Sequence, residues 1–150
     1  MTTSSPHHLY CTFYVHRLLM GVDVLNVQEV IRYQEMTRVP KAPPVIRGLI
    51  NLRGQIVTAL DLRERLGLPP RPSDQLPINV VIRRDGNSVS LLVDEIGDVI
   101  EAPMDALEPP PENLKGPARD LVRAVCKLQD RLLLALDVDR TLDVTSRLSP

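Results

Sequence analysis

The sequence is poor in aromatic residues and nearly balanced in charge. It has no tryptophan, one phenylalanine and three tyrosines, and its 18 lysines and arginines stand against 19 acidic residues, for a formal net charge of −1. A general nucleic-acid binder needs an excess of cations to displace counterions from phosphates. A surface that stacks bases needs more aromatic side chains than this chain has. We therefore expect no nucleic-acid partner.

Long apolar runs and cysteine motifs are also missing. No apolar run approaches the ~20 residues of a membrane-spanning helix, and the N-terminal MTTSSPHH lacks the basic and apolar regions of a secretory signal. Cys11 and Cys126 each stand in an apolar stretch, outside any C-x-x-C motif. They fit small buried side chains better than a disulfide or a reactive thiol. We expect a cytoplasmic protein without membrane insertion.

Histidines are few and badly placed for chemistry. Residues 1–8 are expected to be disordered, and His7 and His8 lie in that stretch, where weak metal binding is the alternative to no role. His16 falls in a predicted turn, and no partner for a general base is evident. The sequence therefore predicts no metal site.

Catalytic motifs are absent as well. The chain contains no glycine-rich nucleotide-binding motif and no G-x-S-x-G. The pairs Asp94–Glu95 and Asp137–Asp139 follow predicted strands, where ending a strand or capping a helix is the alternative to acid–base catalysis. We favour the structural interpretation and expect neither an enzyme nor a cofactor. An enzyme that works through His16 or Asp94 is the weakest of the hypotheses kept.

What the sequence does contain is a series of short segments rich in Val, Ile and Leu, separated by turn signals, which favours strands. Short helices are predicted over Asp61–Leu66 and Asp137–Leu142, each with an acidic start. Four hairpins are predicted: Ile78–Arg83 with Ser88–Val93 around Asp85-Gly86-Asn87, Gly48–Leu52 with Gln55–Leu60 around Arg53-Gly54, Leu121–Leu128 with Arg131–Leu136 around Gln129-Asp130, and Tyr10–Val15 with Gly21–Val24 around His16-Arg17-Leu18.

The order of these elements repeats along the chain. Residues 59–66 match residues 135–142 at an offset of 76, and residues 27–31 resemble residues 96–100 at an offset of 69. Each half reads hairpin, short strand, proline-rich loop, hairpin, short helix. Chance similarity between leucine-rich strands is the alternative, but the shared order favours a duplication. Because a unit of about 70 residues is near the lower limit for its own core, we expect two small barrels packed together.

Arg53 is the residue most suggestive of an interaction site. It stands in the turn of a predicted hairpin, followed by Gly54 and surrounded by apolar residues. Such an arginine can anchor an interface, because its guanidinium donates hydrogen bonds to acceptors while its methylene groups cover apolar area. The alternative is an ordinary polar residue at the tip of a turn. Glu29, on the alternating segment Val27–Ile31, could pair with Arg53. An exposed pair contributes under about 1 kcal/mol, so it would orient the arginine more than stabilise the fold.

The run from Gly21 to Leu68, GVDVLNVQEVIRYQEMTRVPKAPPVIRGLINLRGQIVTALDLRERLGL, closely resembles the CheW family of bacterial chemotaxis coupling proteins. The second half fits through LVDEIGDVI (92–100), PPPE (109–112) and KLQDRLLLALDVDRTL (127–142). The resemblance implies a mostly β, CheW-like domain over 9–144. It would comprise two intertwined five-stranded SH3-like barrels with short helices, roughly 9–68 and 77–144, which can exchange strands. Residues 145–150 would be a C-terminal tail.

The resemblance also implies a function. A CheW-like protein is a non-catalytic adaptor that joins the cytoplasmic tips of methyl-accepting chemoreceptors to the regulatory domain of a CheA-type histidine kinase. It thereby builds signalling arrays beneath the inner membrane, with other CheW-like proteins as further partners. The alternative is an array-filling or decoy protein that binds the kinase or CheW-like partners without transmitting receptor state. By motif, the residues that would contact receptor or kinase are Arg53, Glu29, Val27, Gly48, Asn51 and Gly54.

Two segments depart from the family's pattern. The first turn, His16–Met20, lacks the usual glycine and acidic residues, and Arg123-Ala124-Val125 replaces a common Gly-Val. These departures leave open which receptors or kinase the chain serves.

Overall fold

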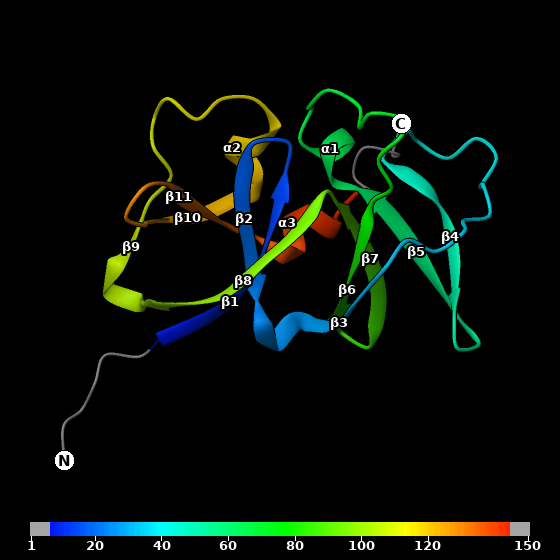
Figure 1. The fold of residues 1–150 in the computed structure, drawn as a ribbon, viewed down its shortest axis with the longest axis horizontal. Helices are drawn as coiled ribbons and strands as arrows, with labels where there is room; N and C mark the ends of the chain where they lie inside the picture. Colours follow the sequence, from blue (N-terminus) through cyan, green and yellow to red (C-terminus); the bar gives the residue numbers. More distant parts are fainter. Residues whose placement is uncertain (1–6, 145–150) are drawn as a thin grey trace, which may run out of the picture.

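A computed structural model describes residues 7–144, which form two β-sheets and several short helices (Figure 1). The described residues hold three one-turn helices, α1 (Leu62–Arg65), α2 (Pro117–Leu121) and α3 (Val138–Leu142), and two 3-10 turns, η1 (Val24–Asn26) and η2 (Met104–Ala106). All of them lie between strands except α3, which follows the last strand. The five-stranded sheet has the order β3 (Val27–Ile31), β6 (Ile78–Arg84), β7 (Asn87–Val93), β5 (Gln55–Asp61), β4 (Ile46–Leu52). The six-stranded sheet has the order β8 (Glu95–Pro103), β1 (His7–Val15), β2 (Leu18–Asp23), β11 (Leu132–Leu136), β10 (Val122–Lys127), β9 (Leu107–Glu108).

All four predicted hairpins form, with small shifts at their ends. The β6–β7 and β4–β5 hairpins reverse at Asp85-Gly86 and Arg53-Gly54, as predicted. The first hairpin is tighter than predicted, because Val15 pairs directly with Leu18 and leaves only two residues in the turn. In the last hairpin, residue 121 ends α2 instead of starting β10.

The expectation that residues 1–8 are disordered is wrong for its last two residues. His7 pairs with Pro103 and His8 with Ala102, because β8 is long enough to extend β1 toward the N-terminus. Their rings also lie near carboxylates, with His7 Nδ1 2.9 Å from Glu101 and His8 Nδ1 3.2 Å from Asp23. Residues 1–6 and the predicted tail 145–150 lie outside the described residues.

The two predicted helices form as α1 and α3, each started by an aspartate. The Asp61 carboxylate accepts a hydrogen bond from Arg63 N at 3.0 Å, and the Asp137 carboxylate accepts one from Arg140 N at 3.0 Å. Such N-caps satisfy backbone donors that a helix leaves free at its start. The third helix, α2, and the two-residue strand β9 fall in a proline-rich stretch that was expected to be loop.

The sheets do not follow the two halves of the sequence. The β1–β2 hairpin pairs with β8 and β11 of the second half, and the β6–β7 hairpin pairs with β3 and β5 of the first half. The ranges 9–68 and 77–144 therefore describe repeats in the sequence, whereas each sheet is built from both of them. Two exchanged sheets of this kind are consistent with two SH3-like barrels, although β9 brings one of them to six strands.

The core runs between the sheets. Its largest cluster takes Phe13 and Met20 from the six-stranded sheet and Leu60, Ile82 and Leu91 from the five-stranded one. Both cysteines are free and buried, as predicted, and burial raises the pKa of each thiol. Among residues 7–144, no helix has the length and apolar character needed to cross a membrane.

Candidate functional site

The tip of the β4–β5 hairpin presents Arg53 and Gly54 in a tight turn. Both residues have positive φ, 52° and 87°, which is the geometry of a type I′ turn and matches the twist of the flanking strands. The Asn51 side chain accepts a hydrogen bond from Gly54 N at 2.9 Å and so braces the turn from within. The backbone therefore places the Arg53 side chain in a defined position at the end of the sheet.

The predicted pair between Arg53 and Glu29 is confirmed. Arg53 Nη2 donates a hydrogen bond to Glu29 Oε2, which links the β4–β5 tip to β3 on the other edge of the same sheet. The Arg53 side chain remains 70% exposed, whereas that of Glu29 is 20% exposed. The Glu29 side chain is thus largely covered by the protein, and most of the Arg53 side chain faces solvent. We call Arg53, Glu29, Asn51 and Gly54 the hairpin-tip site.

The other two predicted site residues lie elsewhere. Val27 is half-buried and packs against the main core. Gly48 is buried, and a Cβ at this position would lie 2.6 Å from Thr37 O and 3.0 Å from Met36 Cβ. Thr37 and Leu49 exchange two backbone hydrogen bonds of 2.9 and 2.8 Å at this place. The glycine is therefore required for close backbone approach, and it offers no side chain to a partner.

The hairpin-tip site has polar neighbours that the sequence did not single out. Ser88 Oγ donates to Gln28 Oε1 at 2.8 Å, and Gln28 Nε2 donates to Glu29 Oε2 at 3.3 Å. Ile56, 61% exposed, follows on β5. A cation, amides and an apolar side chain thus share one end of the five-stranded sheet. Gln28 stands between Val27 and Glu29, the two residues of that segment named as candidates, and no sequence signal pointed to Ser88.

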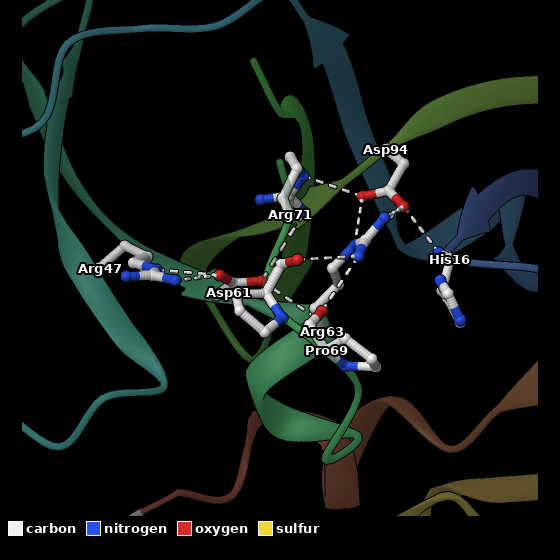
Figure 2. A network of polar contacts seen from close by, with 8 residues as sticks. His16, Arg47, Asp61, Arg63, Pro69, Arg71 and Asp94 are labelled. Carbon is white, nitrogen blue, oxygen red and sulfur yellow. Dashed lines mark hydrogen bonds and ion pairs between the residues drawn. The ribbon is translucent and has the colours of Figure 1, made fainter. Parts of the chain in front are cut away.

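A second group of charged residues lies in the interior, at the end of α1 (Figure 2). Arg63 binds Asp94 through two nitrogens, with Nη2 2.6 Å from Oδ2 and Nε 3.0 Å from the same oxygen. Arg71 Nε donates to Asp94 Oδ1 at 2.8 Å and Arg71 Nη2 lies 3.7 Å from Asp61. The four side chains are 8% exposed or less. We call Asp61, Arg63, Arg71 and Asp94 the crossover cluster.

The crossover cluster extends to the first hairpin and to the surface. His16 N donates to Asp94 Oδ2 at 2.6 Å, and Asp94 N donates to Tyr14 O at 2.9 Å. On the other side, Arg47 Nε donates to Asp61 Oδ2 at 2.9 Å from a half-exposed position. The structural interpretation of Asp94 is thus supported, although its partners were not foreseen.

Hydrogen bonding outweighs burial in setting the charge of Asp94. Desolvation by burial acts to raise the pKa of this carboxyl, but hydrogen bonds from Arg63, from the His16 backbone and from Arg71 lower it below its ordinary value. The carboxylate is held ionised with both oxygens occupied. An acid–base role for Asp94 has no free lone pair to act through, and His16 is an exposed turn residue that meets Asp94 through its backbone. In the described chain, no group of His, Cys, Asp and Glu is arranged to hold a metal ion.

The arrangement is that of a small two-sheet β protein whose most distinctive polar features are a solvent-facing hairpin tip and a buried ion-pair cluster. Comparison with known proteins identifies the family to which this β protein is similar. The family described as CheW-like domain matches residues 9–146. The chemotaxis protein CheW of Bacillus subtilis is 34% identical over 135 residues, which are 89% of this chain and 86% of that protein.

Two further relatives agree. The chemotaxis protein CheW of Klebsiella aerogenes is 30% identical over 122 residues, covering 81% of this chain and 74% of that protein. The crystal structure of the scaffolding protein TtCheW from Thermoanaerobacter tengcongensis superposes with a TM-score of 0.82 at 28% identity and covers 93% of this chain and 94% of that one. The chain belongs to the CheW-like family, and its function is that of a chemotaxis coupling adaptor.

Proposed function

We propose that this chain couples methyl-accepting chemoreceptors to a CheA-type histidine kinase as a non-catalytic scaffold within receptor arrays at the inner membrane, and that the hairpin-tip site contacts the receptor. The observation that carries the proposal is the geometry of Arg53. Its side chain is 70% exposed, yet an ion pair and a braced turn fix its direction. A preordered arginine loses less conformational entropy on binding than a free one.

The surroundings of Arg53 fit a helical partner. Ile56 offers exposed apolar area beside the cation, and amide groups of Gln28 and Gln55 border it. A receptor tip is a helical hairpin, and a helix binds such a surface through apolar contacts flanked by charge-assisted hydrogen bonds. Val27 and Gly48 then act on the strands that carry the site, Val27 by packing β3 against the core and Gly48 by the close approach of β4 to Thr37.

The coupling role is tested by reconstitution. Purified chain is mixed with receptor signalling fragments and the kinase, and kinase autophosphorylation is followed with and without attractant. We expect the chain to raise receptor-dependent kinase activity and to make it sensitive to attractant. If the chain enters sedimenting arrays but kinase activity ignores receptor state, the array-filling alternative is correct.

The receptor contact is tested by charge reversal. We expect Arg53→Glu to abolish receptor pull-down while the circular dichroism spectrum stays unchanged, because the substitution replaces an exposed cation by an anion facing Glu29. The double variant E29R/R53E restores an ion pair but leaves an anion at the tip. If Arg53 contacts the receptor directly, the double variant stays inactive; rescue would mean that only the pair is needed.

A matched control lies on the repeat-related hairpin. Arg131 follows the turn of β10–β11 and is also exposed, and it contacts Tyr14 on the six-stranded sheet. Arg131→Glu changes net charge by the same amount as Arg53→Glu. Receptor binding should survive it. An equal loss with both variants would show an effect of overall charge and would remove Arg53 from the site.

A further inference from the structure

Within residues 7–144, the chain passes from one sheet to the other at two places. The first passage is η1, between β2 and β3, and the second is Asp94, the one residue between β7 and β8. Any change in the angle between the sheets must be absorbed at these two connections. What holds them therefore decides how rigidly the sheets are joined.

Each passage has a two-point contact between an arginine and an aspartate. At the second, Arg63 binds Asp94 with side chains 8% and 5% exposed. Near the first, Arg84 binds Asp139 at 2.7 and 2.8 Å with side chains 42% and 62% exposed, and the two residues line one pocket together with Asp23 and Asn26. Arg84 ends β6 of the five-stranded sheet, and Asp139 belongs to α3, which follows the six-stranded sheet. Both contacts use Nε and Nη2 of the arginine, but Arg84 bonds the two Asp139 oxygens separately, whereas both Arg63 nitrogens meet Asp94 Oδ2 and Nε also lies 3.1 Å from Oδ1. The contacts are opposite in burial.

The buried contact has the more extensive connections. The Asp94 carboxylate is bonded from α1 by Arg63, from the 69–77 loop by Arg71 and from the β1–β2 turn by the His16 backbone (Figure 2). Arg63 Nη1 also donates to the carbonyls of Pro69 and Pro70 at 3.0 and 3.3 Å. Elements of both sheets thus meet on a single carboxylate.

The crossover cluster is expected to fix orientation more than to add net stability. The apolar core between the sheets holds them together, but hydrophobic burial is non-directional. Replacing buried ion pairs by apolar residues of similar volume is often neutral or stabilising, so their net stabilisation is small. Bidentate arginine–carboxylate contacts do, however, impose a fixed mutual orientation. The apolar core therefore holds the two sheets together, and the buried cluster fixes how they are oriented relative to each other.

We propose that the crossover cluster fixes the angle between the two sheets and thereby positions the hairpin-tip site relative to the surfaces carried by the six-stranded sheet. Asp94, Arg63 and Arg71 are positioning residues, because they are buried away from any partner. The second part rests on the proposed coupling function, since a fixed angle matters to signalling only if both sheets carry partner surfaces. The first part can be tested without any partner.

The angle is measured by residual dipolar couplings of backbone amides, fitted separately for each sheet. In the wild-type chain one alignment tensor should fit both sheets. In Asp94→Asn the tensors should diverge in orientation or magnitude. Asp94→Asn leaves the buried Arg63 without a carboxylate and Arg71 with Asp61 alone, so this variant could fail to fold. The triple variant R63M/R71M/D94L therefore removes Asp94 together with its two arginines, and Asp61 keeps its ion pair with Arg47. A folded triple variant with one common tensor would overturn the proposal.

The control is the exposed pair. R84Q/D139N removes the contact near the first passage, and we expect one common tensor, as in the wild-type chain. Divergent tensors in this control but not in the triple variant would assign the angle to the wrong passage and would also overturn the proposal. Urea unfolding of all variants establishes that the chains compared are folded.

The functional part is tested with the triple variant in the reconstituted system. Binding to the receptor fragment alone and to the kinase alone should remain unchanged, while receptor-dependent kinase activation falls at least about fivefold, the lower range of a coupling energy. A merely structural role would weaken both binary interactions as well. If the wild-type chain itself fails to couple, the proposed function is wrong, and the dipolar couplings still decide the role of the cluster.

Discussion

Arg53 and Arg63 both bind a carboxylate, and burial makes them different kinds of residue. The Arg53 side chain is 70% exposed, so its ion pair is screened by water and its charge remains available to a partner. The Arg63 side chain is 8% exposed, so its charge is committed to Asp94. Removing one member of a buried pair is strongly destabilising, by about 3–5 kcal/mol, because the other charge is left uncompensated.

The lowered pKa of Asp94 predicts a defined acid sensitivity. Its ordinary value is 3.8 and its folded value is lower, so the native state keeps the carboxylate ionised where the unfolded chain takes up a proton. The stabilisation is complete above pH about 4 and is lost as pH falls through the folded pKa. Urea midpoints measured between pH 7 and pH 2 should fall more steeply for the wild-type chain than for R63M/R71M/D94L. Parallel curves would contradict the prediction.

Substitution should lower the free energy of unfolding much more at Gly48 than at Arg53. A Cβ at Gly48 would meet backbone, with Thr37 O at 2.6 Å, and backbone cannot rotate away. We expect Gly48→Ala to lower the free energy of unfolding by about 1–3 kcal/mol, the usual cost of overpacking. Arg53→Glu should change it by under about 1 kcal/mol. Urea unfolding of the two variants checks both values, and a stable Gly48→Ala would return Gly48 to the list of partner contacts.

The exposed pair of Glu29 and Arg53 could be predicted from the sequence, but the crossover cluster could not. Glu29 and Arg53 lie on a short alternating segment and a hairpin tip whose positions could be predicted from local patterns. Arg63, Arg71 and Asp94 come from a helix, a proline-rich loop and a strand junction. No local rule brings those three together, because their meeting depends on the path of the chain between the sheets.

At the scale of elements, the two related helices allow a matched comparison of their caps. Asp61 and Asp137 occupy equivalent repeat positions and both cap a helix through a side-chain oxygen. Asp137 is half-buried, so Asp137→Ala should cost about 1 kcal/mol, the usual value of an N-cap. Asp61 is 1% exposed and also pairs with Arg47 and Arg71, so Asp61→Ala loses these contacts as well as the cap and should cost about 2–4 kcal/mol. Thermal unfolding of both variants tests the difference, and equal costs would mean that Asp61 acts only as a cap.

The elements that were predicted share a clear local signal. Alternating apolar residues with a two-residue turn specify a hairpin, and an acidic start with periodic leucines specifies a short helix. The helix α2 was missed because it begins at Pro117, the last proline of a stretch that was expected to be loop. Its proline occupies the first helical position, where the missing N–H costs nothing. Proline is typical both of loops and of the first position of a helix, so Pro117 alone does not show which of the two follows.

At the scale of the whole molecule, duplication could be predicted from the repeat, but the pairing between the copies could not. A hairpin carries information about its own two strands and little about the strand that its outer edge will meet. Here the outer edges of the two exchanged hairpins meet β11 and β5 in parallel pairs, Leu133 beside Leu19 and Ala59 beside Ser90. The resemblance to a family with intertwined barrels was therefore needed to expect the exchange.

The exchange of hairpins predicts that neither half folds without the other. Cutting the chain between Ser73 and Asp74, both exposed in the 69–77 loop, gives two fragments that each hold a hairpin without its partner sheet. Buried residues such as Met20 and Leu91 would then face water, and about 70 residues cannot compensate with a core of their own. Each fragment alone should show a disordered circular dichroism spectrum, and an equimolar mixture should recover the β spectrum. A fragment that folds alone as a monomer would mean that a half can close its own barrel, so that the exchanged pairing is not what makes the halves depend on each other.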